Sequence, residues 1–381
     1  MECHCEGRFP KQSHRFGAGS AISRERDCFA LQARNDNVTA FSALTMIELM
    51  RPIEPMKLMR LIKFIIIGLI LIVPHTLNAQ PKGFSVTYLD SITEDEEGGK
   101  IYFPSSVFFE PVRNEIYIID SKARIIIYTS DFFPIFTLSK RNGIETAQGL
   151  TVDNEGNLYV AQSATKENPR HRISIFNACL RWERDIYLEG FEGAGSFIPY
   201  RLSVDKKGNI YVAASFYPGV LILNNQGKLL EIISPEEEDR KVKITSVTLD
   251  RAGRIYLVSE EEGHVYVYDE NRNFLFKFGE KGGSSGKLSR PLAVGVDNRN
   301  GRMYVVDYMR HTVNVYDDKG KYFFEFGGLG WGEGWFQHPR DIYIDSVGRI
   351  LVADTFNDRI EVLQPHEQSG EKDEGEEPVK H

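Results

Sequence analysis

Short stretches in which apolar and polar residues alternate follow one another along most of this chain, and the pattern predicts β-strands. One unit recurs: an alternating strand ending in Asp, a turn containing Gly, and a second strand that reads apolar-Tyr-Val. Clear copies occupy residues 150–160, 202–212, 247–257, 294–305 and 342–352. A diverged copy runs from Val107 to Ile118. Six tandem copies predict one repetitive domain rather than several unrelated ones.

The spacing of the copies predicts their arrangement. The anchor residues of the second strands are separated by 42, 52, 45, 48 and 47 residues; they are Tyr117, Tyr159, Tyr211, Tyr256, Tyr304 and Leu351. This period is typical of a four-stranded propeller blade. A third apolar strand follows in every unit, and fourth strands are visible at 274–278 and 322–326. The sequence therefore predicts an all-β fold, a six-bladed β-propeller of four-stranded blades over residues 80–363.

The sixth unit has no fourth strand of its own, because the chain turns polar after Leu363. A spare alternating strand lies at residues 84–88, near the other end of the repeats. We expect this N-terminal strand to complete the last blade and close the ring, which removes exposed sheet edges. Residues 364–381 are rich in Glu, Gly and Lys, and they predict a disordered acidic tail.

The best-formed copy also resembles a known family. The Gly-rich run from Gly327, the sequence Pro339-Arg340-Asp341, and the stretch from Asp354 to Arg359 are similar to the NHL repeat, in its exported bacterial type. The resemblance covers roughly residues 84–363 and implies a six-bladed propeller. It implies no single activity, since propellers of this type include binding modules, receptor sensor domains and lyases.

The N-terminal region predicts export. Residues 64–73 form the longest apolar run, preceded by Lys57, Arg60 and Lys63 and followed by Pro74 and Ala79. This order is typical of a secretory signal peptide at residues 56–79, cleaved near Ala79. A membrane span needs about 20 apolar residues, so we expect no permanent membrane span, although a retained anchor stays open. Residues 1–55 show no apolar period and are interpreted as an over-extended, unstructured start.

Composition and charge limit the classes of molecule that this protein is expected to bind. The whole chain has 46 basic and 54 acidic residues; without residues 1–79 it keeps 36 and 47, a net charge of −11. Nucleic-acid affinity comes mainly from Lys and Arg, so this balance argues against a nucleic-acid partner. We expect an extracytoplasmic monomer, periplasmic or secreted.

Candidate binding residues gather on one face of the predicted propeller. Strands alternate in direction, so the linkers between blades and the loops between second and third strands share one face, here called the linker face. The Asp-x-x-Gly turns lie on the other, the turn face. Aromatic and Arg residues are frequent anchors of interfaces, and the linker face carries Trp331, Trp335, His338, Arg340, Arg290, Tyr308, Arg310, His311 and Tyr200. Packing between blades is an equally open interpretation for Trp331 and Trp335.

A second candidate lies in the central channel. Aligned inner strands share a position that is small in four blades: Ser106, Gly149, Ser246 and Ala293. In the remaining two blades, three apart, it is Arg201 and Asp341. These two residues are expected to form a charged pair near the mouth of the channel or to hold a small polar ligand.

The sequence predicts no catalytic residues, no metal ligands and no cofactor. A catalytic zinc needs three converging protein ligands, and His311 and His338 are neighbours without a third His. The Asp residues that end the first strands are expected to cap hairpins. The predicted function is an exported binding or scaffold module that recognises a protein, peptide or envelope polymer through its linker face. A metal-dependent lyase or hydrolase at the central channel is the alternative.

Overall fold

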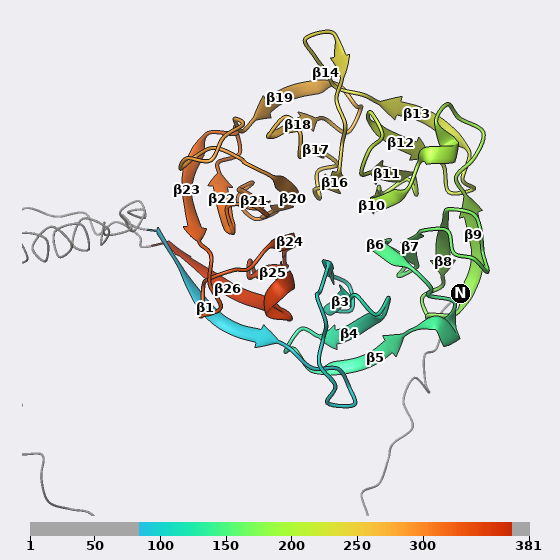
Figure 1. The fold of residues 1–381 in the computed structure, drawn as a ribbon, viewed down its shortest axis with the longest axis horizontal. Helices are drawn as coiled ribbons and strands as arrows, with labels where there is room; N and C mark the ends of the chain where they lie inside the picture. Colours follow the sequence, from blue (N-terminus) through green and yellow to red (C-terminus); the bar gives the residue numbers. More distant parts are fainter. Residues whose placement is uncertain (1–83, 368–381) are drawn as a thin grey trace, which may run out of the picture. The chain divides into compact units, whose positions relative to one another are not determined.

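The computed structural model describes residues 84–367, which form a ring of six four-stranded antiparallel sheets (Figure 1). In five of these sheets the strands follow chain order from the channel outwards, and in the sixth the outermost strand is the first of the chain. The first three blades comprise β2 (Ser106–Glu110), β3 (Glu115–Ile119), β4 (Ile125–Thr129) and β5 (Pro134–Leu138); β6 (Ala147–Val152), β7 (Leu158–Gln162), β8 (Arg172–Phe176) and β9 (Trp182–Tyr187); and β10 (Pro199–Val204), β11 (Ile210–Ala214), β12 (Val220–Leu223) and β13 (Leu229–Ile233).

The second half of the ring continues the same pattern. Its blades comprise β16 (Ser246–Leu249), β17 (Ile255–Ser259), β18 (His264–Tyr268) and β19 (Phe274–Phe278); β20 (Pro291–Val296), β21 (Met303–Asp307), β22 (Thr312–Tyr316) and β23 (Tyr322–Gly327); and β24 (Pro339–Ile344), β25 (Ile350–Asp354), β26 (Arg359–Glu367) and β1 (Phe84–Ile92). The predicted all-β, six-bladed fold is confirmed.

The ring closes through the two ends of the described chain. Strand β1 pairs antiparallel with β26, from Phe84 opposite Glu367 to Ile92 opposite Ile360, and in Figure 1 the blue first strand lies outside the red last one. This confirms the predicted closing strand. Strand β26 continues to Glu367, whereas the sequence predicts that the propeller ends at residue 363 and that a disordered tail begins at residue 364. Pairing with β1 satisfies the backbone groups of this polar segment, so it is a strand without an apolar pattern.

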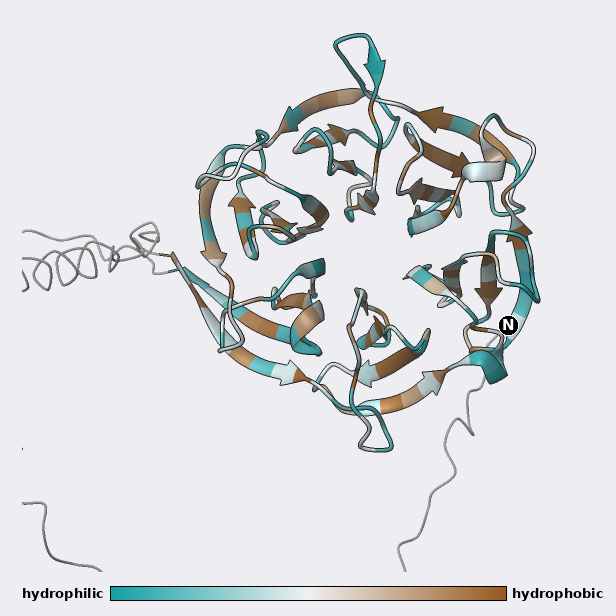
Figure 2. Ribbon diagram, in the orientation of Figure 1, coloured by the Kyte–Doolittle hydropathy of each residue, from teal (hydrophilic) through white to brown (hydrophobic). Residues whose placement is uncertain are grey.

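Additional elements are small. A two-stranded hairpin, β14 (Glu236–Glu237) and β15 (Arg240–Lys241), projects from the rim between the third and fourth blades and is hydrophilic throughout (Figure 2). Three 3-10 helical turns within residues 84–367 are η2 (Lys140–Asn142), η3 (Ala194–Ser196) and η4 (Thr355–Asn357). None of the helical segments in this part of the chain could cross a lipid bilayer. The predicted start 1–55, the signal peptide 56–79 and tail residues 368–381 lie outside the described residues.

The hydrophobic core is divided among the junctions between blades. Six clusters of buried apolar side chains each join two neighbouring sheets, and Figure 2 shows the corresponding brown strand interiors. All six anchor residues of the second strands are buried, at 0–5% exposure. Because each sheet buries both faces against its neighbours, every blade depends on the next one in the ring.

The recurring Asp residues have the predicted structural role. Asp153 accepts hydrogen bonds from the backbone N–H groups of Glu155 and Asn157, which closes the turn, and its second oxygen accepts the hydroxyl of Tyr159. Asp250 likewise accepts the hydroxyl of Tyr256 at 3.1 Å. These copies therefore couple an Asp at the turn to a buried Tyr in the following strand.

Candidate functional site

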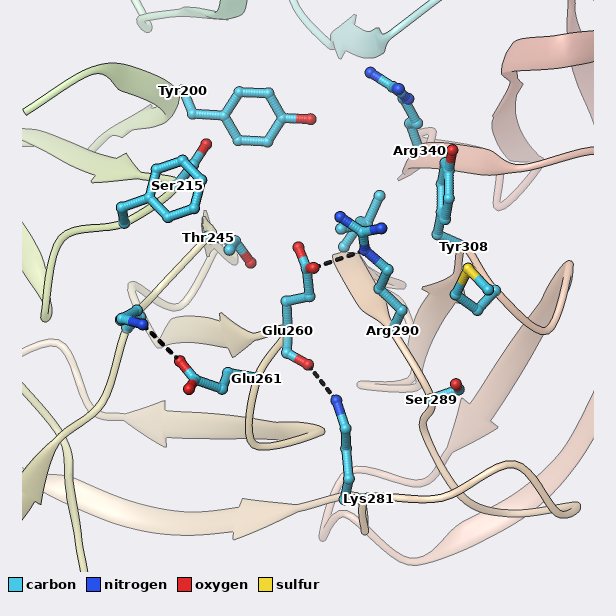
Figure 3. A pocket seen from close by; sticks show the side chains of 14 residues that line it. Tyr200, Ser215, Thr245, Glu260, Glu261, Lys281, Ser289, Arg290, Tyr308 and Arg340 are labelled. Atoms are coloured by element: carbon cyan, nitrogen blue, oxygen red, sulfur yellow. Dashed lines mark hydrogen bonds and ion pairs between the residues drawn. The ribbon is translucent and has the colours of Figure 1, made fainter.

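A hollow on the linker face lies beside the channel mouth, lined by residues of the third, fourth, fifth and sixth blades (Figure 3). Its volume is about 680 Å³. Four residues predicted for this face line it: Tyr200, Arg290, Tyr308 and Arg340. The structure adds further lining residues that sequence reasoning did not select: Ser215, Lys243, Thr245, Glu260, Glu261 and Lys281.

The position of these residues follows from the repeat. Three of them stand four residues after the second-strand anchors Tyr211, Tyr256 and Tyr304: Ser215, Glu260 and Tyr308. The same register places Ser121 and Thr355 at a second hollow of about 460 Å³, on the first, second and sixth blades. Sequence alignment of the copies could have identified this register, because each of these residues lies at or next to the start of the loop after a second strand.

A second register lies at the start of the inner strands. One residue precedes the channel-facing position that is occupied by Arg201 and Asp341 in two blades and by a small residue in the others. In all six blades this preceding residue lines one or both hollows: Ser105, Gln148, Tyr200, Thr245, Leu292 and Arg340. In four blades this residue is the extra one in a β-bulge between the first and second strands, as Tyr200 is between Pro199 and Arg201. A bulge re-aims its side chain, and here it directs the side chain towards the channel mouth.

Most charged groups of the first hollow are already paired. The Nε atom of Arg290 lies 2.6 Å from a carboxylate oxygen of Glu260, and Nζ of Lys243 lies 3.1 Å from Glu261. Lys281 donates to the backbone carbonyl of Glu260 at 2.7 Å. Figure 3 shows Glu260 between Arg290 and Lys281, with Arg340 beside Tyr308. The lining has four cationic side chains and two carboxylates, in a protein whose total charge is −8.

Arg340 differs from its neighbours. Within residues 84–367 its side chain forms no ion pair or hydrogen bond, and its buried Nε has no partner. The guanidinium carbon lies 5.7 Å from the ring centre of Tyr308, and that of Arg290 lies 5.0 Å from the same centre. Tyr308 therefore holds two arginines beside the hollow through cation–π contacts.

The channel position is occupied by an ion pair. Arg201 Nη2 lies 3.5 Å from Asp341 Oδ2, and both residues are buried. Arg201 also donates to the carbonyls of Gln148 and Ser105, while the Ser106 hydroxyl donates to Asp341. The pair thus joins four of the six blades. Burial opposes the charge on Arg201, but the Asp341 carboxylate outweighs this effect and raises the pKa of Arg201.

Other predicted residues are engaged within the fold. Arg310 makes a two-pronged contact with Glu325, at 2.6 and 2.8 Å, and donates to the carbonyl of Lys287. Nδ1 of His311 accepts the backbone N–H of His338 at 2.9 Å. Burial and the nearby His338 lower the pKa of His311, in agreement with a neutral, accepting ring.

His338 and the two Trp residues lie outside both hollows. The His338 ring packs 4.5 Å from Tyr308 and 4.4 Å from His311, measured between ring centres. Trp335 lies over the backbone of Gly328, where an added Cβ would approach its ring to 2.7 Å. Trp331 is 84% exposed. Packing thus accounts for half-exposed Trp335 and leaves Trp331 as a surface residue.

Within residues 84–367, no group of three or more His, Cys, Asp or Glu side chains could hold a metal ion. His311 and His338 are neighbours, as predicted, and no third ligand joins them in this part of the chain.

Comparison with known proteins supports the fold. A family model described as a 6-bladed beta-propeller matches residues 292–362. A protein of unknown function from Bacteroides thetaiotaomicron is 13% identical, with a TM-score of 0.58, covering 74% of this chain and 76% of its own. An auxiliary nutrient binding protein from Bacteroides ovatus is 14% identical, with a TM-score of 0.57, covering 75% and 77%. A second auxiliary nutrient binding protein, from Bacteroides thetaiotaomicron, is 12% identical, with a TM-score of 0.56, covering 76% and 78%. No curated protein matches the chain. At these identities the similarity establishes the six-bladed propeller fold that this chain shares with them.

Proposed function

We propose that this protein is an exported propeller that binds a protein, peptide or envelope polymer through the hollows on its linker face. The observation that carries the proposal is the unpaired guanidinium of Arg340, held beside Tyr308 at the edge of a hollow of about 680 Å³. Concave sites with aromatic walls and a few aimed polar groups are typical binding sites. The fold shared with two auxiliary nutrient binding proteins agrees with a binding role.

Retention of envelope material on immobilised protein tests the binding role. The linker-face variant combines Tyr308→Ala with Arg340→Gln, and the matched control changes Lys206 and Arg251 to Ala on the turn face. We expect the linker-face variant to lose retention of soluble envelope components and the control to keep it. Equal retention by both variants and the unaltered protein would contradict the proposal, provided that their circular dichroism spectra agree.

Export is a separate part of the proposal. It rests on the basic residues before the apolar run 64–73 and on Ala79 after it. Fractionation of the producing cell should recover the protein outside the cytoplasm, and its N-terminal sequence should start at or near Gln80. Recovery in the cytoplasm with residues 1–79 attached would contradict export.

A further inference from the structure

Arg340 belongs to both hollows of the linker face. It lines the hollow of about 680 Å³ on the third to sixth blades and the hollow of about 460 Å³ on the first, second and sixth blades. The two hollows therefore meet at one side chain beside the channel mouth. A ligand long enough to occupy both would pass over Arg340.

The guanidinium of Arg340 has no carboxylate partner among the described residues, whereas the neighbouring arginines each have one. Arg290, Arg310 and Arg201 each contact a carboxylate, at 2.6, 2.6 and 3.5 Å. Among the described residues Arg340 has none, and its buried Nε is unpaired. A buried donor without a partner costs free energy, and a guanidinium fits a carboxylate with two parallel hydrogen bonds. The missing partner is therefore expected from a ligand.

The walls of the hollows suit a sugar chain. Tyr200 and Phe216 line the first hollow, where Tyr308 is already covered by His338 and two arginines. Phe103 and Phe356 lie in the second hollow with their ring centres 5.5 Å apart. Aromatic faces pack against the C–H surface of a sugar ring. Hydroxyl groups without a hydrogen bond among the described residues line the same hollows: Ser105, Ser215 and Ser289. These can donate to and accept from sugar hydroxyls.

A peptide is less well matched, because an extended peptide binds largely through backbone hydrogen bonds. The backbone carbonyls of Ser105 and Gln148, at the start of two inner strands, already accept hydrogen bonds from Arg201. The ion pair with Asp341 keeps Arg201 in this position.

We infer that the linked hollows bind an acidic oligosaccharide, laid across the channel mouth with a uronic acid carboxylate on Arg340. This assignment rests on the proposed function and names its ligand class.

Calorimetry with defined oligosaccharides tests the assignment. The probes are the trimers of galacturonic acid and glucuronic acid, the neutral trimers of galactose and glucose, and a trimer of glutamate. We expect an acidic sugar trimer to bind, its neutral counterpart to bind at least tenfold more weakly, and added salt to weaken only the acidic ligand. Arg340→Gln should reduce affinity for the acidic trimer at least tenfold, and Arg340→Lys should recover part of it, because Lys keeps the charge without the fork. Arg251→Gln on the turn face is the control.

The outcomes separate this assignment from the proposed function. The acidic-sugar assignment would be overturned if neutral sugars or the glutamate trimer bound with the same affinity as the acidic sugars. If Tyr308→Ala then abolished binding and Arg340→Gln did not, the hollow would remain a binding site. Binding of none of the acidic trimers would also overturn it. An acidic trimer that binds equally to the protein carrying both Tyr308→Ala and Arg340→Gln would contradict the hollow itself as the site.

Discussion

Arg201 and Asp341 meet across the central channel, with Nη2 3.5 Å from Oδ2, although 140 positions separate them in the chain. They belong to the inner strands β10 and β24 of opposite blades. A pair of this kind ties the ring together from within, because each partner also bonds to a neighbouring inner strand. Removing one partner leaves a buried charge without compensation.

We therefore predict that Asp341→Asn destabilises the protein by about 3–5 kcal/mol. Chemical denaturation followed by tryptophan fluorescence measures the change. The matched control is Glu261→Gln, whose partner Lys243 lies 3.1 Å away with both side chains about half exposed. Because exposed pairs contribute little, this control should change stability by less than about 1 kcal/mol. Equal effects of the two substitutions would show that the channel pair has no special role.

The small inner-strand positions predict a steric effect. A Cβ added to Gly149 would lie 2.3 Å from the carbonyl oxygen of Tyr200, on the next blade. We expect Gly149→Ala to cost about 1–3 kcal/mol, since the inner strands would have to separate. Gly283→Ala is the control, because a Cβ there meets nothing within 4 Å. Thermal unfolding of both variants checks the prediction, and an unchanged melting temperature for Gly149→Ala would contradict it.

Closure of the ring by β1 can be tested by truncation. Deleting the chain through Ile92 removes the whole strand and exposes the edge of β26 and the core side chains that Phe84 covers. We expect a lower melting temperature and concentration-dependent aggregation, because an open strand edge pairs with other chains. A chain that starts at Phe84 is the control and should behave like one starting at Gln80. A monomeric truncated protein of unchanged stability would contradict the closing role.

Buried Glu361 predicts a pH effect. Burial raises its pKa from 4.5 to about 7, although its carboxylate accepts the Gly334 N–H and contacts Arg359. The folded protein therefore keeps a proton that the unfolded chain releases, and stability falls as the pH rises from 4.5 to about 7. This loss is about 3 kcal/mol.

Glu361→Gln should remove this part of the pH dependence, because the side chain stays neutral. Urea unfolding of both proteins at about pH 5 and about pH 8 measures it. The stability advantage of the variant should be larger at the higher pH. The exposed substitution Glu261→Gln serves again as the control and should leave the pH dependence unchanged. An equal difference at both pH values would exclude Glu361 as the titrating group.

The candidate site was accessible to sequence reasoning only in part. Tyr200, Arg290, Tyr308 and Arg340 were placed on the correct face, since strand direction alternates along each blade. Arg310 has the same residue type and lies on the same face, but Glu325 on the outer strand β23 engages it. Whether an arginine is paired depends on side chains that come together from different strands. A local sequence pattern therefore cannot predict the pairing.

The alternation of apolar residues and the period of the Asp-Gly-Tyr unit determined the strands, the six blades and the closing strand. These features are local or repeated, so each copy confirms the others. Tertiary structure decided the rest. Bulges turned Tyr200 and Arg340 towards the channel mouth, and pairing with β1 extended β26 to Glu367. Ring closure brought Arg201 to Asp341 and left Arg340 without a carboxylate among the described residues, because contacts between blades depend on curvature and packing that no single repeat contains.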